Sequence, residues 1–203
     1  AEDWPIRAGM NNPKQRLGQY AFALSGGQRQ RAMIAMALCT NPDILIADEQ
    51  TTALVVTTQA QTLDLLNELQ EKNGMSIIMI THDLGVIAEL ADDVNVMYLG
   101  KVVESGTIEQ VYKDPLHPYT KSLLSSIPSM ATKHRERLPI LQGTIPHPVA
   151  RPSGCNFQPN CDGEKKECLD ASPISIEESP GHFVLYCGVC YEQDKCAWYP
   201  RGI

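Results

Sequence analysis

The feature that most constrains the fold is a pair of short apolar runs with an amphipathic stretch between them. The runs occupy residues 44–47 and 75–80, and their length and bounding turn signals are typical of buried strands. The stretch between them, residues 57–74, ends in a glycine suited to a helix C-cap, and its apolar face is formed by Leu63, Leu66 and Leu69. Strand and helix alternating at this spacing predict a parallel α/β layer. Strands of such a layer are covered on both faces, which is the expectation for residues 44–47.

Further elements are predicted on both sides of this unit. Residues 1–23 are polar and interrupted by Pro and Gly, and a helix follows at residues 28–39. Its apolar positions at helical spacing are Met33, Ile34, Ala37 and Leu38, and Cys39 is expected to be a small buried core residue. Downstream, the sequence predicts a helix at 84–91, a hairpin at 93–106 and a short helix at 107–113.

The character of the sequence changes after about residue 127. Five prolines interrupt residues 127–154, which we interpret as a connector, and six of the seven cysteines lie between Cys155 and Cys196. The first residues have no apolar signal-peptide core, and a cysteine-dense tail without a secretion signal is more typical of a metal or cluster site than of disulfides. No apolar run approaches the roughly 18–20 residues that cross a bilayer. The net charge of −7 disfavours binding to a nucleic-acid backbone.

A serine and two glycines stand directly before the helix at 28–39. The run is Leu24, Ser25, Gly26, Gly27 and Gln28. Glycine lets the backbone approach an anion closely, and the free N–H groups of a first helical turn favour a phosphate. Ser25 can cap the helix or donate a hydrogen bond to a phosphate oxygen, and taken alone the run is more typical of a capped turn.

Two carboxylates and an imidazole follow the two apolar runs. Asp48 and Glu49 end the first run, and His82 follows the second within Thr81-His82-Asp83. The carboxyl ends of parallel strands meet at the sheet edge where α/β proteins bind ligands. Asp48 is a candidate ligand for Mg²⁺, and Glu49 is a candidate to orient or deprotonate an attacking water. Taken alone, the acidic pair is also typical of a solvated strand end, and a lone histidine is more often structural than catalytic.

The order LSGGQ, then Asp48-Glu49, then His82 at successive strand ends resembles the ATP-binding-cassette (ABC) ATPases. The resemblance implies an α/β fold that is the C-terminal part of a P-loop NTPase, with a parallel sheet and flanking helices. It implies that residues 24–28 are the family signature, that Asp48 and Glu49 end the Walker B strand, and that His82 senses the γ-phosphate of ATP.

The resemblance also implies ATP and Mg²⁺ as ligands and a second cassette as a partner. In this family two cassettes pair head to tail, as homodimer or heterodimer, and each ATP lies between the phosphate loop of one and the signature of the other. The phosphate loop normally precedes the signature, and no G-x-x-x-x-G-K-[ST] occurs in these 203 residues. The chain alone is therefore expected to bind ATP weakly and to hydrolyse none.

Two positions depart from the family pattern. Gln50 stands where Pro usually follows the glutamate, and Val55 stands where the family has an Asp that organises contacts across the cassette dimer. An apolar side chain accepts no hydrogen bond, so a non-catalytic structural or regulatory cassette half is the alternative reading. A soluble ABC ATPase that acts on nucleic acid or ribosomes is a further alternative, which the negative net charge of the chain and the His-Pro-Tyr segment disfavour.

Residues 114–128, with His117, Pro118 and Tyr119, resemble the C-terminal extension of oligopeptide/dipeptide and nickel permease ATP-binding subunits. In that subfamily a cysteine set binds an iron–sulfur cluster, and the matching positions here are Cys155, Cys161, Cys168 and Cys187. Four thiolates suit a [4Fe–4S] cluster. Zinc is the alternative, because Cys187 and Cys190 form a CxxC pair and Cys196 adds a thiolate.

The resemblance predicts three parts: a partial ABC ATPase cassette at 1–113, the permease-type extension and linker at 114–150, and an irregular Cys-rich, cluster-binding tail at 151–203. It implies an ATPase subunit that powers import of peptides or a related solute. The expected partners are transmembrane permease subunits, with a periplasmic or extracellular solute-binding protein engaged only indirectly and no nucleic acid. The expected location is the cytoplasmic face of the inner membrane, as a peripheral subunit.

Overall fold

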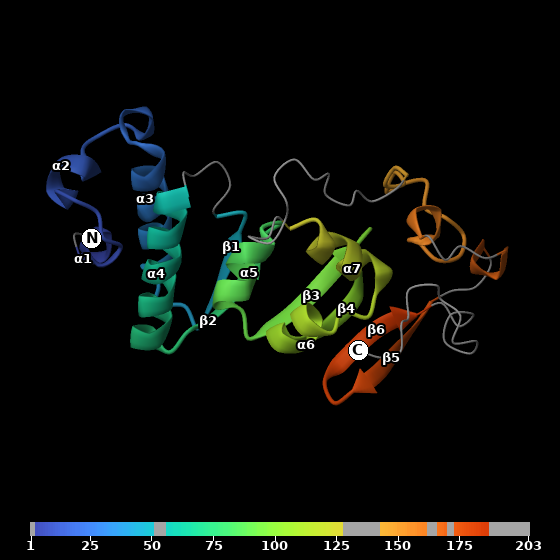
Figure 1. The fold of residues 1–203 in the computed structure, drawn as a ribbon. Coiled ribbons are helices and arrows are strands. Elements are labelled where there is room, and N and C mark those ends of the chain that lie inside the picture. The colour runs from blue at the N-terminus through green and yellow to red at the C-terminus, as the bar shows by residue number, and fades with distance from the viewer. Residues whose placement is uncertain (1–2, 51–55, 128–142, 162–165, 170–172, 187–203) are drawn as a thin grey trace, which may run out of the picture. The chain divides into compact units, whose positions relative to one another are not determined.

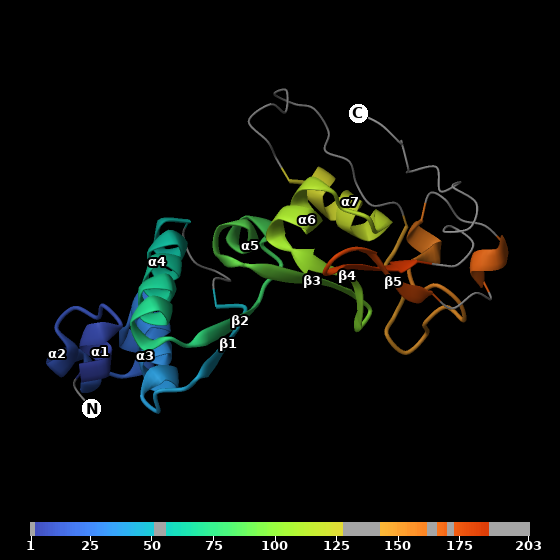
Figure 2. The same cartoon turned by 90° about the horizontal axis from the view of Figure 1, so that it is seen from below.

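The computed structural model describes residues 3–50, 56–127, 143–161, 166–169 and 173–186. It divides into two compact units, residues 1–90 and 91–203. Their elements are labelled in Figure 1 and seen from below in Figure 2. The division into 1–113, 114–150 and 151–203 follows motifs rather than compactness, and it stays a prediction. No described helix is long and apolar enough to cross a membrane.

The first unit consists of helices and a short parallel sheet. Its helices are α1 (Asp3–Arg7), α2 (Pro13–Leu17), the 3₁₀ helix η1 (Ala21–Ala23), α3 (Gly26–Leu38), α4 (Val56–Asn73) and α5 (Leu84–Leu90). Its strands are β1 (Ile44–Asp48) and β2 (Ser76–Ile80), which pair in parallel with Asp48 opposite Ile80. The predicted strand–helix–strand order at 44–80 is confirmed.

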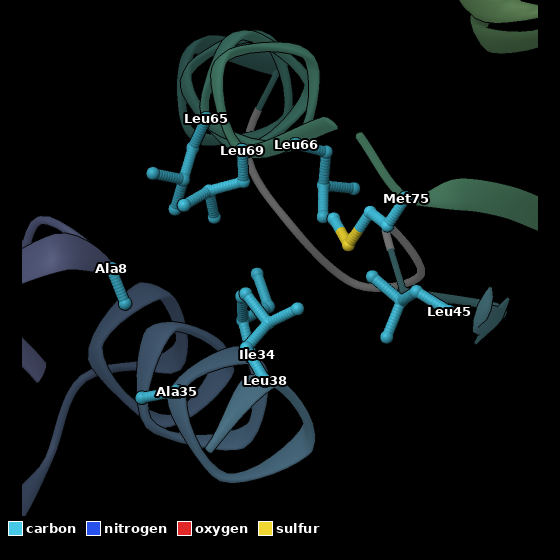
Figure 3. Close-up of a cluster of buried hydrophobic side chains, with 9 residues drawn as sticks. All are labelled: Ala8, Ile34, Ala35, Leu38, Leu45, Leu65, Leu66, Leu69 and Met75. Carbon is cyan, nitrogen blue, oxygen red and sulfur yellow. The ribbon is translucent and has the colours of Figure 1, made fainter. Parts of the chain in front are cut away.

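The core of the first unit lies between α3, α4 and one face of the sheet. Figure 3 shows the leucines of α4 pointing toward α3, with Leu45 of β1 and Met75 closing the side of the cluster. The expected apolar face of α4 is confirmed, because Leu63, Leu66 and Leu69 are all buried. Burying side chains of this size stabilises the fold by about 1.5–3 kcal/mol each.

The prediction that residues 44–47 are buried on both faces is wrong. Leu45 and Ala47 are buried, but Ile44 and Ile46 on the opposite face are 57% and 61% exposed. The second strand alternates in the same way. Helices α3 and α4 contribute to a core on only one face of this sheet, so the other face meets solvent in the described chain.

Residues 3–23 form three short helices and bury Ala8 and Met10. Two further expectations for the first unit need correction. Helix α3 buries Ala35 and leaves Met33 exposed, so its apolar face is rotated from the predicted one. Cys39 is exposed rather than buried, since it is the C-cap that follows the last buried position of α3.

The second unit is built on an antiparallel sheet in the order β3-β4-β6-β5. Its elements are β3 (Asp93–Tyr98), β4 (Lys101–Thr107), α6 (Ile108–Lys113), α7 (Pro118–Ser125), the 3₁₀ helices η2 (Gln158–Asn160) and η3 (Lys166–Leu169), β5 (Ile174–Ser179) and β6 (His182–Tyr186). Helices α6 and α7 lie over one face of this sheet (Figure 2). The predicted hairpin at 93–106 and the helix after Thr107 are confirmed. The expected irregular tail is wrong over residues 174–186, which form a hairpin that extends the sheet.

A buried carboxylate organises the second unit. Glu104 of β4 is fully buried, and its two oxygens accept N–H groups of Leu116 and His117, each at 2.8 Å. Its Oε1 also accepts from Nε2 of His182 on β6, at 2.9 Å. A buried charge is tolerated when its lone pairs are satisfied in this way. Glu104 therefore fixes both the segment before α7 and the hairpin β5–β6 against β4.

His117 is buried at the start of α7, where its Nδ1 accepts the backbone N–H of Tyr119 at 3.1 Å. Its ring packs edge-on against Phe157, with the centroids 5.4 Å apart. Burial, with a smaller contribution from the positive charge of Lys121, lowers the pKa of His117 to about 3. The folded state therefore keeps this ring neutral.

The low pKa of His117 predicts a loss of stability in mild acid. The unfolded chain takes up a proton near pH 6.5 and the folded chain does not, so stability is complete above about pH 6.5 and falls as the pH drops toward 3, by up to about 1.4 kcal/mol per pH unit. We expect His117→Asn, which keeps a hydrogen-bond acceptor but cannot titrate there, to flatten this dependence. Urea unfolding between about pH 7 and about pH 4.5 measures it.

The control is His147→Asn, because His147 is an exposed histidine in the same unit. This variant should keep the pH dependence of the parent. Equal slopes for the parent and His117→Asn would contradict the assignment of the effect to His117.

Candidate functional site

Glu49 and His82 meet at the carboxyl ends of the two parallel strands. Because Asp48 pairs with Ile80, the residues that follow each strand leave the sheet at the same edge. His82 Nδ1 lies 3.0 Å from Oε1 and 2.9 Å from Oε2 of Glu49. Both side chains are exposed, at 76% for His82 and 41% for Glu49. The imidazole therefore donates to a carboxylate that solvent or a ligand can also reach.

The residues on either side of His82 fix its position. The Thr81 hydroxyl accepts the N–H of Asp83 at 3.0 Å, and the Asp83 carboxylate accepts the N–H groups of Gly85 and Val86 at the start of α5. Asp83 also accepts from the Gln59 amide on α4 at 2.8 Å. That hydrogen bond is the main cause of a lowered pKa of Asp83, with the two backbone N–H groups and His82 adding to it against the opposing effect of burial.

Glu49 has an unusual backbone conformation. Its φ of 52° lies in the left-handed region, which is costly for a residue with a β-carbon. Its N–H donates to the carbonyl of Ile80 at 2.9 Å, and the next carbonyl, that of Gln50, accepts from the side chain of Gln30 on α3. These two contacts hold the turn that aims Glu49 toward His82. Gln30 is buried, so it links α3, which begins within residues 24–28, to the sheet edge that carries Asp48 and Glu49.

The negative charge of Glu49 controls the titration of His82. The hydrogen bond and charge of Glu49 raise the pKa of His82 above its usual value, and Asp83 adds a smaller effect in the same direction. Desolvation opposes the rise only weakly, because the ring is exposed. His82 is therefore a candidate for a positively charged contact to an anion near neutral pH.

The signature residues form a capped helix start. Ser25 is the N-cap of α3, with its hydroxyl oxygen accepting the N–H of Gln28 at 3.3 Å, while the Gln28 side chain accepts the N–H of Ser25 at 3.0 Å. Of the two roles expected for Ser25, helix cap and phosphate ligand, the structure shows the helix cap. The hydroxyl proton is still available to a phosphate oxygen, and the N–H groups of the first turn have no preceding helical carbonyl to pair with.

Asp48 lies at the end of β1 with its side chain exposed. A solvent-accessible carboxylate is the type of ligand that Mg²⁺ prefers, so Asp48 fits a role in holding the ion that accompanies a nucleotide. Gln50 lies beside Glu49 and is half-buried. Val55, the second departure from the family pattern, lies outside the described residues.

The cysteine set does not form a metal site in the described part of the chain. Cys155, Cys161 and Cys168 belong to one loop assembly, in which the N–H of Cys155 donates to the carbonyl of Cys168 at 3.1 Å. A β-carbon at Gly154 would overlap that same carbonyl, so the glycine allows the close approach. Among the described residues, however, no three His, Cys, Asp or Glu side chains are arranged to hold a metal ion. Cys187, the fourth predicted ligand, and the CxxC pair lie outside them.

Two family models match separate parts of this chain. Residues 1–52, which include residues 24–28 and the carboxylates Asp48 and Glu49, match the model described as ABC transporter. Residues 103–168, which include His117 and three of the cysteines, match the model described as Oligopeptide/dipeptide transporter, C-terminal region. The resemblance to ABC transporter ATP-binding subunits is confirmed.

Curated relatives and a solved structure agree with the family models. A protein of Brucella abortus (strain 2308), named as a peptide import ATP-binding protein, is 49% identical over 160 residues, which cover 79% of this chain and 48% of the relative. A protein of Brucella ovis with the same description is 48% identical over 182 residues, covering 86% of this chain and 54% of the relative. The chain thus spans about half the length of the curated relatives it matches.

An ATP-binding cassette of an ABC transporter in its ADP conformation superposes with a TM-score of 0.51 at 24% identity. The match covers 60% of this chain and 47% of that structure. At this identity the likeness concerns the fold alone. The mixed α/β cassette architecture is therefore confirmed.

The sequence identified Glu49 and His82, the two side chains that meet, but not the residues that hold them in place. Asp83 was visible as the residue after His82, and its position before a helix is a recognisable N-cap signal. Gln59 and Gln30 carried no such signal, because each sits inside a helix that was predicted from its apolar residues alone.

The contact between Glu49 and His82 predicts a change that NMR can measure. In Glu49→Gln the neighbouring negative charge is lost, so the pKa of His82 should fall toward 6.5. The carbon-bound ring protons of His82, followed through a pH titration, report this value. The matched control is Glu68→Gln, an exposed glutamate of α4 paired with Lys72, which should leave the His82 titration unchanged. An unchanged pKa in Glu49→Gln would contradict the observed contact.

Proposed function

We propose that the complete protein is the ATP-binding, ATP-hydrolysing subunit of an ABC transporter that imports peptides or a related solute. The contact between Glu49 and His82 at adjacent parallel strand ends is the observation that carries this proposal, since it joins two candidate reacting groups. The names of the Brucella relatives support the peptide class of solute.

Each described site residue has a part in the proposed hydrolysis. Glu49 orients or deprotonates the attacking water, a role worth roughly 10²–10⁴-fold in rate. His82 contacts the γ-phosphate, and Asp48 would hold the Mg²⁺ that neutralises phosphate charge. Ser25 and the first-turn N–H groups of α3 contact the ATP held by a second cassette. The phosphate-binding loop for the ATP beside Glu49 is not encoded in these 203 residues.

The proposed assembly contains a second cassette and transmembrane permease subunits. ATP-driven closure of the two cassettes moves the permease subunits, and hydrolysis resets them. The subunit then sits at the cytoplasmic face of the inner membrane, held by the permease. A solute-binding protein takes part only through the permease.

A hybrid tests the proposed chemistry. The phosphate-loop segment of the Brucella abortus relative, which the family order places before the signature, is joined to this chain to complete one cassette. We expect the hybrid to hydrolyse ATP and Glu49→Gln to reduce kcat by roughly 10²-fold or more, because the water loses its base. The 203-residue chain alone should show no ATPase. A Glu49-dependent ATPase in the chain alone would contradict this prediction.

The same hybrid protein tests the alternative that this chain belongs to a non-catalytic cassette half. If the hybrid binds ATP but hydrolyses none, and Val55→Asp then produces hydrolysis, the natural chain is a structural or regulatory half. If the hybrid with Val55 is active, that alternative is excluded.

We also propose that the C-terminal unit binds a [4Fe–4S] cluster, with zinc as the alternative. The support is the set of four cysteines and the backbone contact that brings Cys155 beside Cys168. After anaerobic purification we expect a brown protein with equal amounts of iron and sulfide. Cys168→Ser should lose the colour, while Cys39→Ser, outside the set, should keep it. A colourless protein that contains zinc would contradict the cluster.

A further inference from the structure

Gln30 is a buried polar side chain near the start of α3. Its exposed fraction is 6%, and the buried residues that follow it on the helix, Ile34 and Leu38, belong to the hydrophobic core of the first unit. A buried amide costs stability unless both its donor and its acceptor find partners. The contacts of Gln30 therefore indicate what the amide does at this position.

The two ends of the Gln30 amide are in different situations. Its Nε2 donates to the carbonyl of Gln50, the residue after Glu49. Its Oε1 is buried and has no hydrogen-bond partner in the described part of the chain. A buried acceptor without a partner costs at least as much stability as a typical hydrogen bond contributes. Gln30 thus holds the Gln50 carbonyl without a net gain in stability.

The carbonyl that Gln30 holds belongs to the turn that carries Glu49. The φ of Glu49 is 52°, a conformation that is costly for a residue with a β-carbon, so the turn needs contacts that fix it. On one side, the N–H of Glu49 donates to the carbonyl of Ile80 at 2.9 Å. On the other side, Gln30 holds the carbonyl of Gln50. The backbone is therefore fixed on both sides of Glu49, by the sheet and by α3.

We propose that Gln30 is a positioning residue for Glu49: its side-chain donor holds the Gln50 carbonyl so that the Glu49 carboxylate stays in contact with His82. The inference rests on the proposed function, because it names a residue that keeps the water-activating carboxylate in place. Gln30 acts through the backbone and transfers no proton itself. Because Ser25 caps the same helix, α3 presents its first turn to the ATP of a second cassette and also holds the carboxylate for the ATP of its own.

The variant Gln30→Met tests this role in the 203-residue chain. Methionine has a similar length and is apolar, so it removes both the donor to Gln50 and the buried acceptor. We expect the pKa of His82, measured by NMR, to fall toward 6.5, because the Glu49 carboxylate is no longer held beside the ring. We expect the urea midpoint to stay the same or to rise, because the unpaired acceptor is gone.

The matched control is Ile34→Val, because Ile34 lies one turn further along the buried face of α3. This variant loses part of a core side chain, so its urea midpoint should fall, while the pKa of His82 should keep the value of the parent. A second control combines Gln30→Met with Glu49→Gln. If Gln30 acts through Glu49, the double variant should show the same His82 pKa as Glu49→Gln alone.

Two outcomes would overturn the proposal. One is an unchanged His82 pKa in a folded Gln30→Met chain. The other is a lower urea midpoint together with a lower His82 pKa in both Gln30→Met and Ile34→Val, which would make Gln30 an ordinary core residue whose loss loosens the whole unit.

The hybrid with the Brucella abortus phosphate-loop segment separates this role from the proposed function. Gln30→Met should lower its kcat by roughly 10-fold or more and leave its KM for ATP nearly unchanged, because a misplaced carboxylate slows the reaction of bound ATP. A hybrid without ATPase removes the proposed function, while the His82 titration of the 203-residue chain still decides the role of Gln30. An active hybrid whose kcat is insensitive to Gln30→Met removes only the positioning role.

Discussion

The parallel register of β1 with β2 determines where the chemically important side chains of the first unit lie. Asp48 opposite Ile80 means that the two strands end level, so the residues that follow them emerge at one edge. A shift by one residue would turn every strand side chain to the other face and carry Glu49 away from His82. The hydrogen bond from Glu49 N–H to the Ile80 carbonyl continues the ladder one step past the strands and secures this register.

The fold of the first unit was predictable where periodicity is strong. Leu63, Leu66 and Leu69 identified the buried face of α4, and the two apolar runs identified β1 and β2. Chemistry at strand ends was predictable too, because Glu49 and His82 follow those runs directly. Cys39 was misplaced because residue type says little about burial at the end of a helix, where a difference of one position moves a side chain to the surface.

Other features depended on long-range contacts that local patterns do not contain. The hairpin at 174–186 was taken for irregular structure, although Pro180 and Gly181 form a turn signal between its strands. Its position beside β4 depends on Glu104, 78 residues before His182. The exposed isoleucines show a different limit. Their sequence pattern reflects a strand covered on both faces, and the described chain supplies a cover for only one.

The hydrogen bonds of Glu104 have a consequence for how such sequences diverge. One carboxylate serves the backbone before α7 and the imidazole of His182, so these distant segments share a single acceptor. Loss of the Glu104 carboxylate would leave three buried donors without an acceptor at once, which is far more costly than losing one hydrogen bond. Among relatives, positions 104 and 182 should therefore change together or not at all.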